Sequence, residues 1–362
     1  MPRPIVATIH MGALKHNLDV MRKAAHGRTL WAVVKANAYG HGLLRAAEAF
    51  KDADGLAMID VSEARKVREH GWTKRILLLE GFFDETDIPL LEKYDVETIV
   101  HDRRLLAMLQ KNAPYKSLKV HIKINSGMNR LGFHPEEEEA IRKELEAIDG
   151  VKVMGAVTHF ANAEPTYDTE KPASVNKQLD RMHQIGAKDL SLCMANSAAT
   201  IWQKAVTGDA VRAGVALYGV SPDSHFTSQE LGLEPAMTLS AKIIALQNVP
   251  AGEAIGYGSR FITKRDSRIA VVACGYADGY PRCAKDGTPT MVEGKIAPLA
   301  GAVSMDMLTI DVTDIPEAEV GSTVELWGKN VSVNEVAKHC GTIGYELICA
   351  IALRVPVTQD AN

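Results

Sequence analysis

The feature that most constrains this chain is a regular alternation between residues 30 and 218. Short aliphatic or β-branched runs are each followed by a longer segment, and several of these segments have helical periodicity. The eight runs are Leu30–Val34, Gly55–Ile59, Arg75–Leu79, Glu97–Val100, Leu118–Ile124, Val151–Thr158, Leu190–Met194 and Ala210–Leu217. Eight strand–helix repeats predict an α/β fold, a parallel (β/α)₈ barrel of the TIM type. The rival is a doubly wound open sheet, whose dinucleotide-binding form is disfavoured because the first turn lacks GxGxxG.

The pattern changes after residue 232. Strand-like runs separated by Gly, Pro and Asp turns replace the alternation. These runs are Met237–Val249, Ala254–Thr263, Arg268–Cys274, Thr288–Val292, Leu308–Val312 and Thr323–Trp327, and Val333–His339 is the one clear helical pattern. We therefore predict a barrel domain over residues 1–232 and a C-terminal mainly-β domain over residues 233–362. Residues 1–10 are a candidate for pairing with the second domain.

Local signals predict how some of the barrel helices begin. Residues 41–50 have the periodicity of a helix, and Ser62 is the expected N-cap of a helix over residues 63–69. Pro135 suits a first helical position, and the acidic run 136–139 suits the positive end of the helix dipole. We interpret the acidic run as the solvated start of a helix, in preference to a metal site.

Composition excludes several classes of function. The 41 Lys and Arg against 45 Asp and Glu give a net charge of −4, so no nucleic-acid partner is expected. No apolar run approaches the roughly 18 residues that a membrane-spanning helix needs, and the first residues lack a signal-peptide pattern, so no membrane partner is expected. The five cysteines form no CxxC pair, which disfavours disulfides and a metal site and fits the cytoplasm.

Polar residues gather at the predicted carboxyl ends of the barrel strands, where barrel enzymes carry their chemistry. Lys35 follows the apolar pair Val33-Val34. It either snorkels to solvent or is held in an apolar pocket, where its neutral amine could form a Schiff base. Ser197 and Gly214 follow later strands and offer the hydroxyl and backbone N–H donors that bind phosphate in many barrels. Each has a plainer explanation as a helix cap or a turn, but together they indicate one functional face.

The segment Val33–Gly42, VVKANAYGHG, resembles the pyridoxal-phosphate attachment motif of bacterial alanine racemases. The resemblance continues in family order through both predicted domains. It covers Met128–Phe133, His159-Phe160, Asn196–Thr200, Arg212–Gly214, Ile255–Gly258, Gly275–Arg282, Ser304–Asp306 and Gly344–Glu346. The chain is therefore identified as a member of this fold-type III family. The resemblance implies an isomerase that interconverts L-alanine and D-alanine, either for peptidoglycan or for D-alanine catabolism.

The resemblance also implies a mechanism with two bases. Lys35 would hold pyridoxal 5'-phosphate as an aldimine, and its released amine would serve as one base. A second base is needed because one side chain cannot easily reach both faces of a planar intermediate, and Tyr257 matches the family's second base. A phenol has a pKa of about 10, so a neighbour must stabilise its phenolate. His159 beside Arg212 has that role in the family.

The remaining roles are likewise implied by the resemblance alone. Cofactor binding falls to Lys35, Tyr39, His159, Asn196, Ser197, Arg212, Gly214, Val215 and Tyr345. The substrate is expected to contact Arg130 and Met305, with Asp306 orienting that region. Glu164, Tyr276 and Arg282 match the substrate entryway, although some relatives have Asp in place of Glu164. Lys123 matches a lysine that is carbamylated in many relatives.

The expected partners are alanine and a second copy of the chain. In the family, Tyr257, Tyr276 and Met305 reach the active site from the second subunit, so the resemblance implies a homodimer. Two enzyme alternatives remain: a broad-specificity amino-acid racemase and a pyridoxal-phosphate-dependent amino-acid decarboxylase. The non-enzyme alternative is a pyridoxal-phosphate carrier, which would lack the second domain. No metal is expected.

Overall fold

The computed structural model describes residues 3–167, 170–186, 190–203 and 208–360. The chain forms two compact units. The barrel unit comprises Asn17–Ala38 and Gly42–Leu217, and the β unit comprises Met1–His16, Tyr39–His41 and Tyr218–Asn362. The short segment Tyr39–His41 therefore belongs to the β unit, although residues of the barrel unit precede and follow it in sequence.

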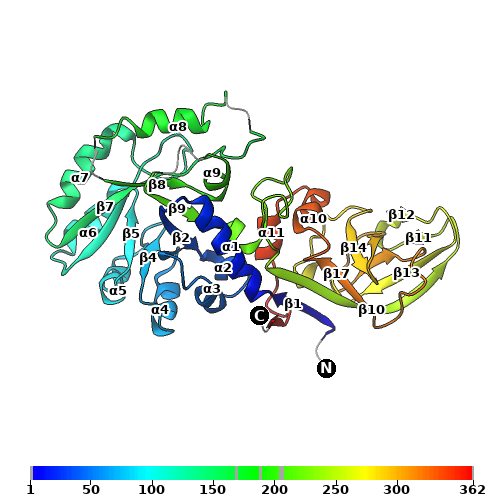
Figure 1. Ribbon diagram of the computed structural model, residues 1–362. Coiled ribbons are helices and arrows are strands. Elements are labelled where there is room, and N and C mark those ends of the chain that lie inside the picture. Colours follow the sequence, from blue (N-terminus) through cyan, green and yellow to red (C-terminus); the bar gives the residue numbers. More distant parts are fainter. Residues whose placement is uncertain (1–2, 168–169, 187–189, 204–207, 361–362) are drawn as a thin grey trace. The chain divides into compact units, whose positions relative to one another are not determined.

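Eight parallel strands close into a barrel (Figure 1), which confirms the predicted fold class. They are β2 Thr29–Val33, β3 Gly55–Met58, β4 Arg75–Leu78, β5 Glu97–Val100, β6 Leu118–Lys123, β7 Val151–Val157, β8 Ser191–Ala195 and β9 Ala210–Ala213. Closure comes from β2, which pairs in parallel with both β3 and β9. Several strands are buried at every position, as expected for a parallel sheet covered on both faces.

Helices connect the strands. In the barrel unit they are α3 Leu43–Ala49, α4 Val61–Glu69, α5 Ile88–Lys93, α6 Arg103–Lys111, α7 Glu138–Glu146, α8 Val175–Met182 and α9 Ser197–Trp202, while α1 Met11–Ala24 precedes β2. Short 3₁₀ turns, η1 Glu85–Asp87 and η2 Pro135–Glu137, lead into α5 and α7. None of the described helices has the length and apolar character needed to cross a membrane.

Three local expectations need correction. Asp60, and not Ser62, is the N-cap of α4, because its side chain accepts the Ser62 backbone N–H. The acidic run is only partly solvated, since Glu138 is fully buried on the inward face of α7. Arg142 compensates by donating to Glu138 over 3.1 Å. The last apolar run is shorter as a strand than predicted, because β9 ends at Ala213 and a 3₁₀ turn, η4 Val215–Tyr218, follows.

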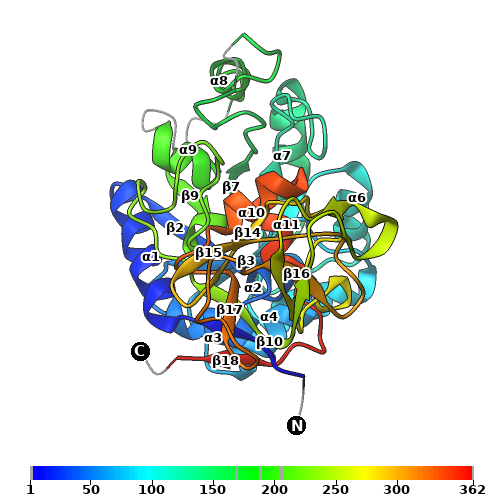
Figure 2. The same ribbon diagram turned by 90° about the vertical axis from the view of Figure 1, so that its right-hand side faces the viewer.

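The β unit is built on one eight-stranded sheet (Figure 2). Its strands are β1 Ile5–Ile9, β10 Met237–Val249, β13 Ser267–Val272, β14 Pro289–Val292, β15 Lys295–Pro298, β16 Leu308–Asp311, β17 Thr323–Trp327 and β18 Val357–Gln359. Strand β1 pairs antiparallel with β10 and parallel with β18. The sheet therefore joins the start of the chain to its end.

Two helices and one hairpin complete this unit. The helices are α10 Val333–Cys340 and α11 Gly344–Cys349, of which only the first was predicted. The predicted strand over residues 254–263 is instead a small hairpin of β11 Ala254–Ile255 and β12 Phe261–Ile262. Between them lies the 3₁₀ turn η5 Tyr257–Ser259, where two glycines with positive φ reverse the chain.

Candidate active site

A left-handed turn follows Lys35 at the carboxyl end of β2. In the segment α2 Lys35–Tyr39, the residues Ala36, Asn37, Ala38 and Tyr39 all have φ between 50° and 55°. Each such residue costs roughly 1–2 kcal/mol for an L-amino acid. The turn is held by Asn37, whose side chain accepts the Leu43 N–H at 2.9 Å. Strain of this kind is typical of functional sites, where the surrounding structure enforces it.

Three cations of the barrel unit, Lys35, Arg130 and Arg212, act electrostatically on Lys123, and we call these four residues the cationic cluster. Lys123 is the last residue of β6, and Arg212 lies in β9 with 5% of its surface exposed. Burial, followed by the charges of Arg212 and Arg130, lowers the pKa of Lys123 to about 7. None of the leading charges that act on Lys123 is a carboxylate. Positive charge therefore predominates around Lys123, with Arg212 buried, Lys35 and Lys123 half-buried and Arg130 exposed.

Neutral acceptors hold the guanidinium of Arg212. It donates to the carbonyl oxygens of Thr158 at 2.6 Å, Cys193 at 2.7 Å and Met194 at 3.3 Å, and to the Cys193 Sγ at 3.1 Å. Its Nη2 also lies 3.2 Å from Nδ1 of His159. Because a guanidinium can only donate, His159 accepts through Nδ1 and carries its proton on Nε2. Burial and the Arg212 charge keep the pKa of His159 well below 6.5, so this imidazole is neutral.

Ser197 and Gly214 are adjacent, as their places at two strand ends predicted. The Gly214 N–H donates to the Ser197 hydroxyl at 2.8 Å, and both residues are buried with Val215. The cap of α9 is Asn196, whose side chain accepts the Ala199 N–H at 2.9 Å. Ser197 is therefore not the helix cap, and its hydroxyl ties α9 to the turn after β9.

Tyr39 and Tyr345 meet within the β unit. Their ring centroids are 6.4 Å apart, and Tyr39 also stacks on Tyr218 at 4.8 Å. Burial raises the pKa of the Tyr39 phenol, which therefore stays protonated. Gly40 explains the close packing here, since a side chain at its φ of 82° would place Cβ 2.2 Å from the carbonyl oxygen of Ile348 in α11.

The other candidate residues of the β unit are exposed. Tyr257 has 72% of its surface exposed, and Gly256 and Gly258 on either side adopt φ of 71° and 69°. Met305 and Tyr276 are also exposed, at 53% and 41%. These apolar and phenolic groups stand on the surface of their unit, where they are available to another surface.

A buried carboxylate joins the Tyr276 and Met305 turns. Asp278, which is fully buried, accepts from Arg354 at 2.7 Å, and the same arginine donates to Asp306 at 2.7 Å. The Tyr276 N–H donates to the Ser304 carbonyl at 3.0 Å. Sequence reasoning named Asp306 and missed the other two members, because nothing in the local sequence shows that residues 278 and 354 meet.

The two remaining entryway candidates lie in different units. Glu164 follows β7 in the barrel unit and is partly buried, whereas Arg282 is exposed in the β unit. Sequence reasoning also missed Gln178 and Ser126, which are fully or almost fully buried polar residues of the barrel unit. Gln178 could have been found, because it occupies the middle of the apolar stripe of α8 between Val175 and Met182.

Two family models match the chain in succession. The model of the alanine racemase N-terminal domain matches residues 9–222, and that of the C-terminal domain matches residues 236–359. The chain belongs to the alanine racemase family. This membership confirms the resemblance inferred from the sequence motifs and the expectation of an enzyme of this family.

Alanine racemases match this chain in sequence over 99% of its length. An alanine racemase from Paraburkholderia phytofirmans is 47% identical, with 99% of this chain and 100% of the relative covered. A catabolic alanine racemase from Klebsiella aerogenes is 46% identical, with 99% of each chain covered. The solved structure of the biosynthetic alanine racemase from Pseudomonas aeruginosa superposes with a TM-score of 0.94 at 42% identity, covering 99% of each chain. A catabolic alanine racemase is thus similar to this chain in sequence, and a biosynthetic one is similar in sequence and fold.

Proposed function

We propose that this chain racemises alanine with pyridoxal phosphate, and that Lys35 and Tyr257 are the two bases. The cationic cluster is the observation that carries the proposal. It places a lysine amine and two guanidinium groups at one end of the barrel, with no carboxylate among the leading charges that act on Lys123 or His159. Such a field suits an anionic cofactor and a substrate that carries a carboxylate.

The residues of the barrel unit fit this cofactor. Lys35 offers the amine that its aldehyde requires, and the Ser197 hydroxyl and the backbone around Gly214 offer donors for its phosphate. Arg212 is the proposed partner of the ring nitrogen, which it would leave unprotonated because a guanidinium does not readily release a proton. The proposed cofactor-binding set is completed by Tyr39, His159, Asn196, Val215 and Tyr345.

Pyridoxal phosphate, when bound, supplies an electron sink that makes the α-proton of an amino acid removable. The chain supplies proton transfer on the two faces of the substrate. We assign Nζ of Lys35 to one face and the phenolic oxygen of Tyr257 to the other. Tyr257 is proposed to come from the second subunit of a homodimer, together with Tyr276 and Met305, and its high exposure within its own unit supports this assignment.

His159 supports the phenolate that Tyr257 must become. A neutral imidazole whose Nδ1 accepts from Arg212 has an N–H left on Nε2, and that N–H can donate to a phenolate oxygen. The positive charge of Arg212 lies directly behind the imidazole. Both effects would stabilise negative charge on a phenolic oxygen placed beside the imidazole.

Arg130 is the proposed ligand of the substrate carboxylate, together with the main chain at Met305. Arg130 is exposed, and no described residue forms an ion pair with its guanidinium. Asp306 is proposed to orient the Met305 turn, which its contact with Arg354 supports. Alanine is the preferred substrate in this proposal, and serine is expected to react slowly, because one additional small group changes binding by only about 1–3 kcal/mol.

Lys123 is proposed to be carbamylated. Its neutral amine adds to carbon dioxide, so that a C–N bond forms, one proton leaves and a carbamate anion results. The pKa of about 7 supports this reaction, since the amine is partly neutral near neutral pH. The resulting anion would attract Arg130, whereas an ammonium at the same place repels it. We also propose a cytoplasmic location, because none of the five cysteines takes part in a disulfide.

Exchange of the α-hydrogen in deuterated water tests the proposal. The wild-type chain should exchange and invert both L-alanine and D-alanine. Tyr257→Phe should slow exchange from L-alanine and Lys35→Ala should slow exchange from D-alanine, each by roughly 10²–10⁴-fold. Tyr94→Phe, in the barrel unit away from the cationic cluster, is the matched control and should exchange normally.

Each alternative predicts a different result. A decarboxylase would release carbon dioxide, and a carrier would neither exchange nor invert alanine. Equal rates for alanine and for amino acids with long side chains would indicate a broad-specificity racemase. Deletion of the gene separates the two biological roles, since a biosynthetic enzyme leaves the cell dependent on added D-alanine.

A further inference from the structure

A buried glutamine of the barrel unit contacts two of the turns that carry the proposed site. Gln178 lies in α8 and is fully buried, as are its inward neighbours Val175 and Met182, to within a few per cent. An uncharged amide in an apolar stripe is costly unless its donors and acceptor are all satisfied. The contacts of Gln178 therefore show what the amide does.

Both amide hydrogens and the amide oxygen of Gln178 have hydrogen-bond partners. Nε2 of Gln178 donates to the Ser126 hydroxyl and to the His159 carbonyl, each at 2.9 Å, and Oε1 accepts the Ala161 N–H at 2.8 Å. The carbonyl of His159 only accepts and the N–H of Ala161 only donates, so the amide has one acceptable orientation. Gln178 thus holds the backbone on both sides of Phe160.

The hydrogen bonds continue beyond Gln178 as a series in which each donor can be assigned. The Thr158 hydroxyl donates to the Ile124 carbonyl at 2.8 Å, so its only proton is used there. The Ser126 hydroxyl, 2.7 Å away, must then donate to Thr158 and accept from Gln178. Protons therefore point from Gln178 through Ser126 and Thr158 to Ile124. Ser126 and Thr158 are each 1% exposed, so water does not compete for these bonds.

This series of hydrogen bonds ends beside the Arg212–His159 pair. The Thr158 carbonyl accepts from Arg212 at 2.6 Å, and His159 is the next residue, with Nδ1 at 3.2 Å from the same guanidinium. Ser126 begins the turn that leads to Arg130. Residues 158–161 are thus held by Arg212 on one side and by Gln178 on the other.

We propose that Gln178 is a positioning residue of the racemase: its amide, acting through Ser126 and Thr158, sets the hydrogen bond between Arg212 and His159 and the course of the turn toward Arg130. The inference rests on the proposed function for its catalytic consequence, but its structural part does not. It assigns to α8 a role in proton transfer, although none of the residues proposed to bind cofactor or substrate lies in this helix.

Two substitutions at one position separate positioning from space filling. Gln178→Met keeps the length of the side chain and removes the donors and the acceptor. Gln178→Glu keeps the shape but places carboxylate oxygens against the His159 carbonyl and the Ser126 hydroxyl, where donors are required. Gln184→Met, at an exposed position just beyond α8, is the matched control.

The first readout is the tautomer of His159, observed by ¹⁵N NMR of labelled histidines and assigned by loss of the signal in His159→Gln. The wild type should show a neutral ring protonated on Nε2. Gln178→Met and Gln178→Glu should shift this signal or split it between tautomers, and Gln184→Met should leave it unchanged. This measurement does not depend on racemisation, so it stands even if the proposed function fails.

The second readout is kinetic. Gln178→Met should lower kcat/KM for alanine by about 10-fold to 100-fold, since small displacements of catalytic groups have effects of this size. Both a lower kcat and a higher KM are expected, because His159 and the Arg130 turn shift together. If the variant only unfolds at lower temperature, with His159 and kcat/KM unchanged, the positioning role is wrong. Should it fail to fold, Ser126→Ala, which breaks the same chain at its next member, must give both changes for the proposal to survive.

Discussion

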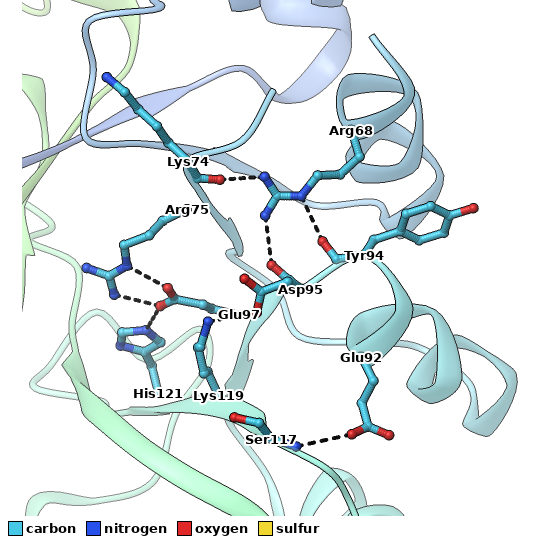
Figure 3. Close-up of polar contacts among 10 residues, drawn as sticks. All are labelled: Arg68, Lys74, Arg75, Glu92, Tyr94, Asp95, Glu97, Ser117, Lys119 and His121. Atoms are coloured by element: carbon cyan, nitrogen blue, oxygen red, sulfur yellow. Dashed lines mark hydrogen bonds and ion pairs between the residues drawn. The ribbon is translucent and has the colours of Figure 1, made fainter. Parts of the chain in front are cut away.

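The two ends of the barrel differ in how their charged side chains are paired. Near the amino ends of the strands, Glu97 at the start of β5 accepts from Arg75 at the start of β4, over 2.5 and 2.7 Å (Figure 3). His121 of β6 lies 2.7 Å from the same carboxylate. At the other end, the cationic cluster has no carboxylate among its leading charges. At one end the charged groups pair with each other, whereas at the other end the charges that act on Lys123 are mainly positive.

Strand β6 contributes a residue to each end, so the difference in charge pairing arises over a short distance along the chain. His121 and Lys123 are two residues apart in β6, so their side chains point to the same face. Burial alone would raise the pKa of Glu97, but the hydrogen bonds and charges of Arg75 and His121 outweigh it and lower that pKa to about 2. Burial, followed by the neighbouring cations, lowers the pKa of Lys123 to about 7. Two residues along the strand therefore separate a paired carboxylate from an amine whose pKa is lowered.

The end of the barrel that holds the Arg75–Glu97 pair is closely packed. The guanidinium of Arg75 lies 4.6 Å from the ring centroid of Trp31, in a cation–π contact. Gly55 is required beside it, since a Cβ there would approach the Trp31 ring to 2.4 Å. The guanidinium of Arg68 donates hydrogen bonds to four backbone carbonyl oxygens, of which Figure 3 shows three; they belong to Trp72, Lys74, Tyr94 and Asp95. The contrast suggests that this end serves stability and the other serves chemistry.

The largest effect on stability is expected from Glu97→Gln. Glu97 is buried but Arg75 is partly exposed, so water compensates part of the charge that is left behind, and the free energy of unfolding should fall by at most about 3 kcal/mol. Racemisation by the folded fraction should not change. Urea unfolding measures the first effect and an alanine assay the second. Glu85→Gln, which breaks an exposed pair with Lys111, should change the stability much less, because water screens that pair.

The comparison would be weakened if Glu97→Gln abolished racemisation while leaving stability intact. The two ends of the barrel would then be coupled through the strands that they share, and the division between stability and chemistry would not hold.

A smaller effect is expected from acid. The pKa of Glu97 is lower in the folded chain than the unfolded value of about 4.3, so its stabilisation is complete above that value and is lost as the pH falls toward 2. About half of it, roughly 1.5 kcal/mol, should be gone at pH 3. Unfolding measured between pH 5 and pH 3 should therefore show the wild type and Glu97→Gln converging. Parallel curves would assign the acid sensitivity to other carboxylates.

The smallest effect concerns Lys123 at the cationic end. With ¹³C-labelled bicarbonate above pH 7, the wild type should show a carbamate signal by NMR, and the intact mass should increase by one carbon dioxide. Lys123→Met should lack the signal and have a KM for alanine a few-fold higher, because Arg130 loses its anionic neighbour. Lys119→Met, which removes an exposed lysine of the same strand paired with Asp95, should retain the signal. An unmodified amine in saturating bicarbonate would contradict carbamylation.

Much of the barrel followed from the sequence because its signals are local. Apolar runs of four to eight residues that alternate with helical patterns are recognised within one window, and β2 to β9 start within a residue or so of the predicted runs. The same reasoning failed at 254–263, where Gly256 and Gly258 turn an apparent strand into a hairpin. It also failed at Glu138, because whether an acidic side chain is solvated depends on what packs against its helix.

The sequence by itself determined the strand–helix order, the motifs of the family and the lysine at the end of the first barrel strand. Tertiary structure alone decided which charges are neutralised. Arg75 and Glu97 are 22 residues apart, and Lys123 and Arg212 are farther apart still, yet barrel closure brings each pair into electrostatic contact. The same holds for Gln178, whose position in an apolar stripe is visible in the sequence while its partners are not. Coulombic and hydrogen-bond energies depend on distance in space and on burial, and neither is a property of a local stretch of chain.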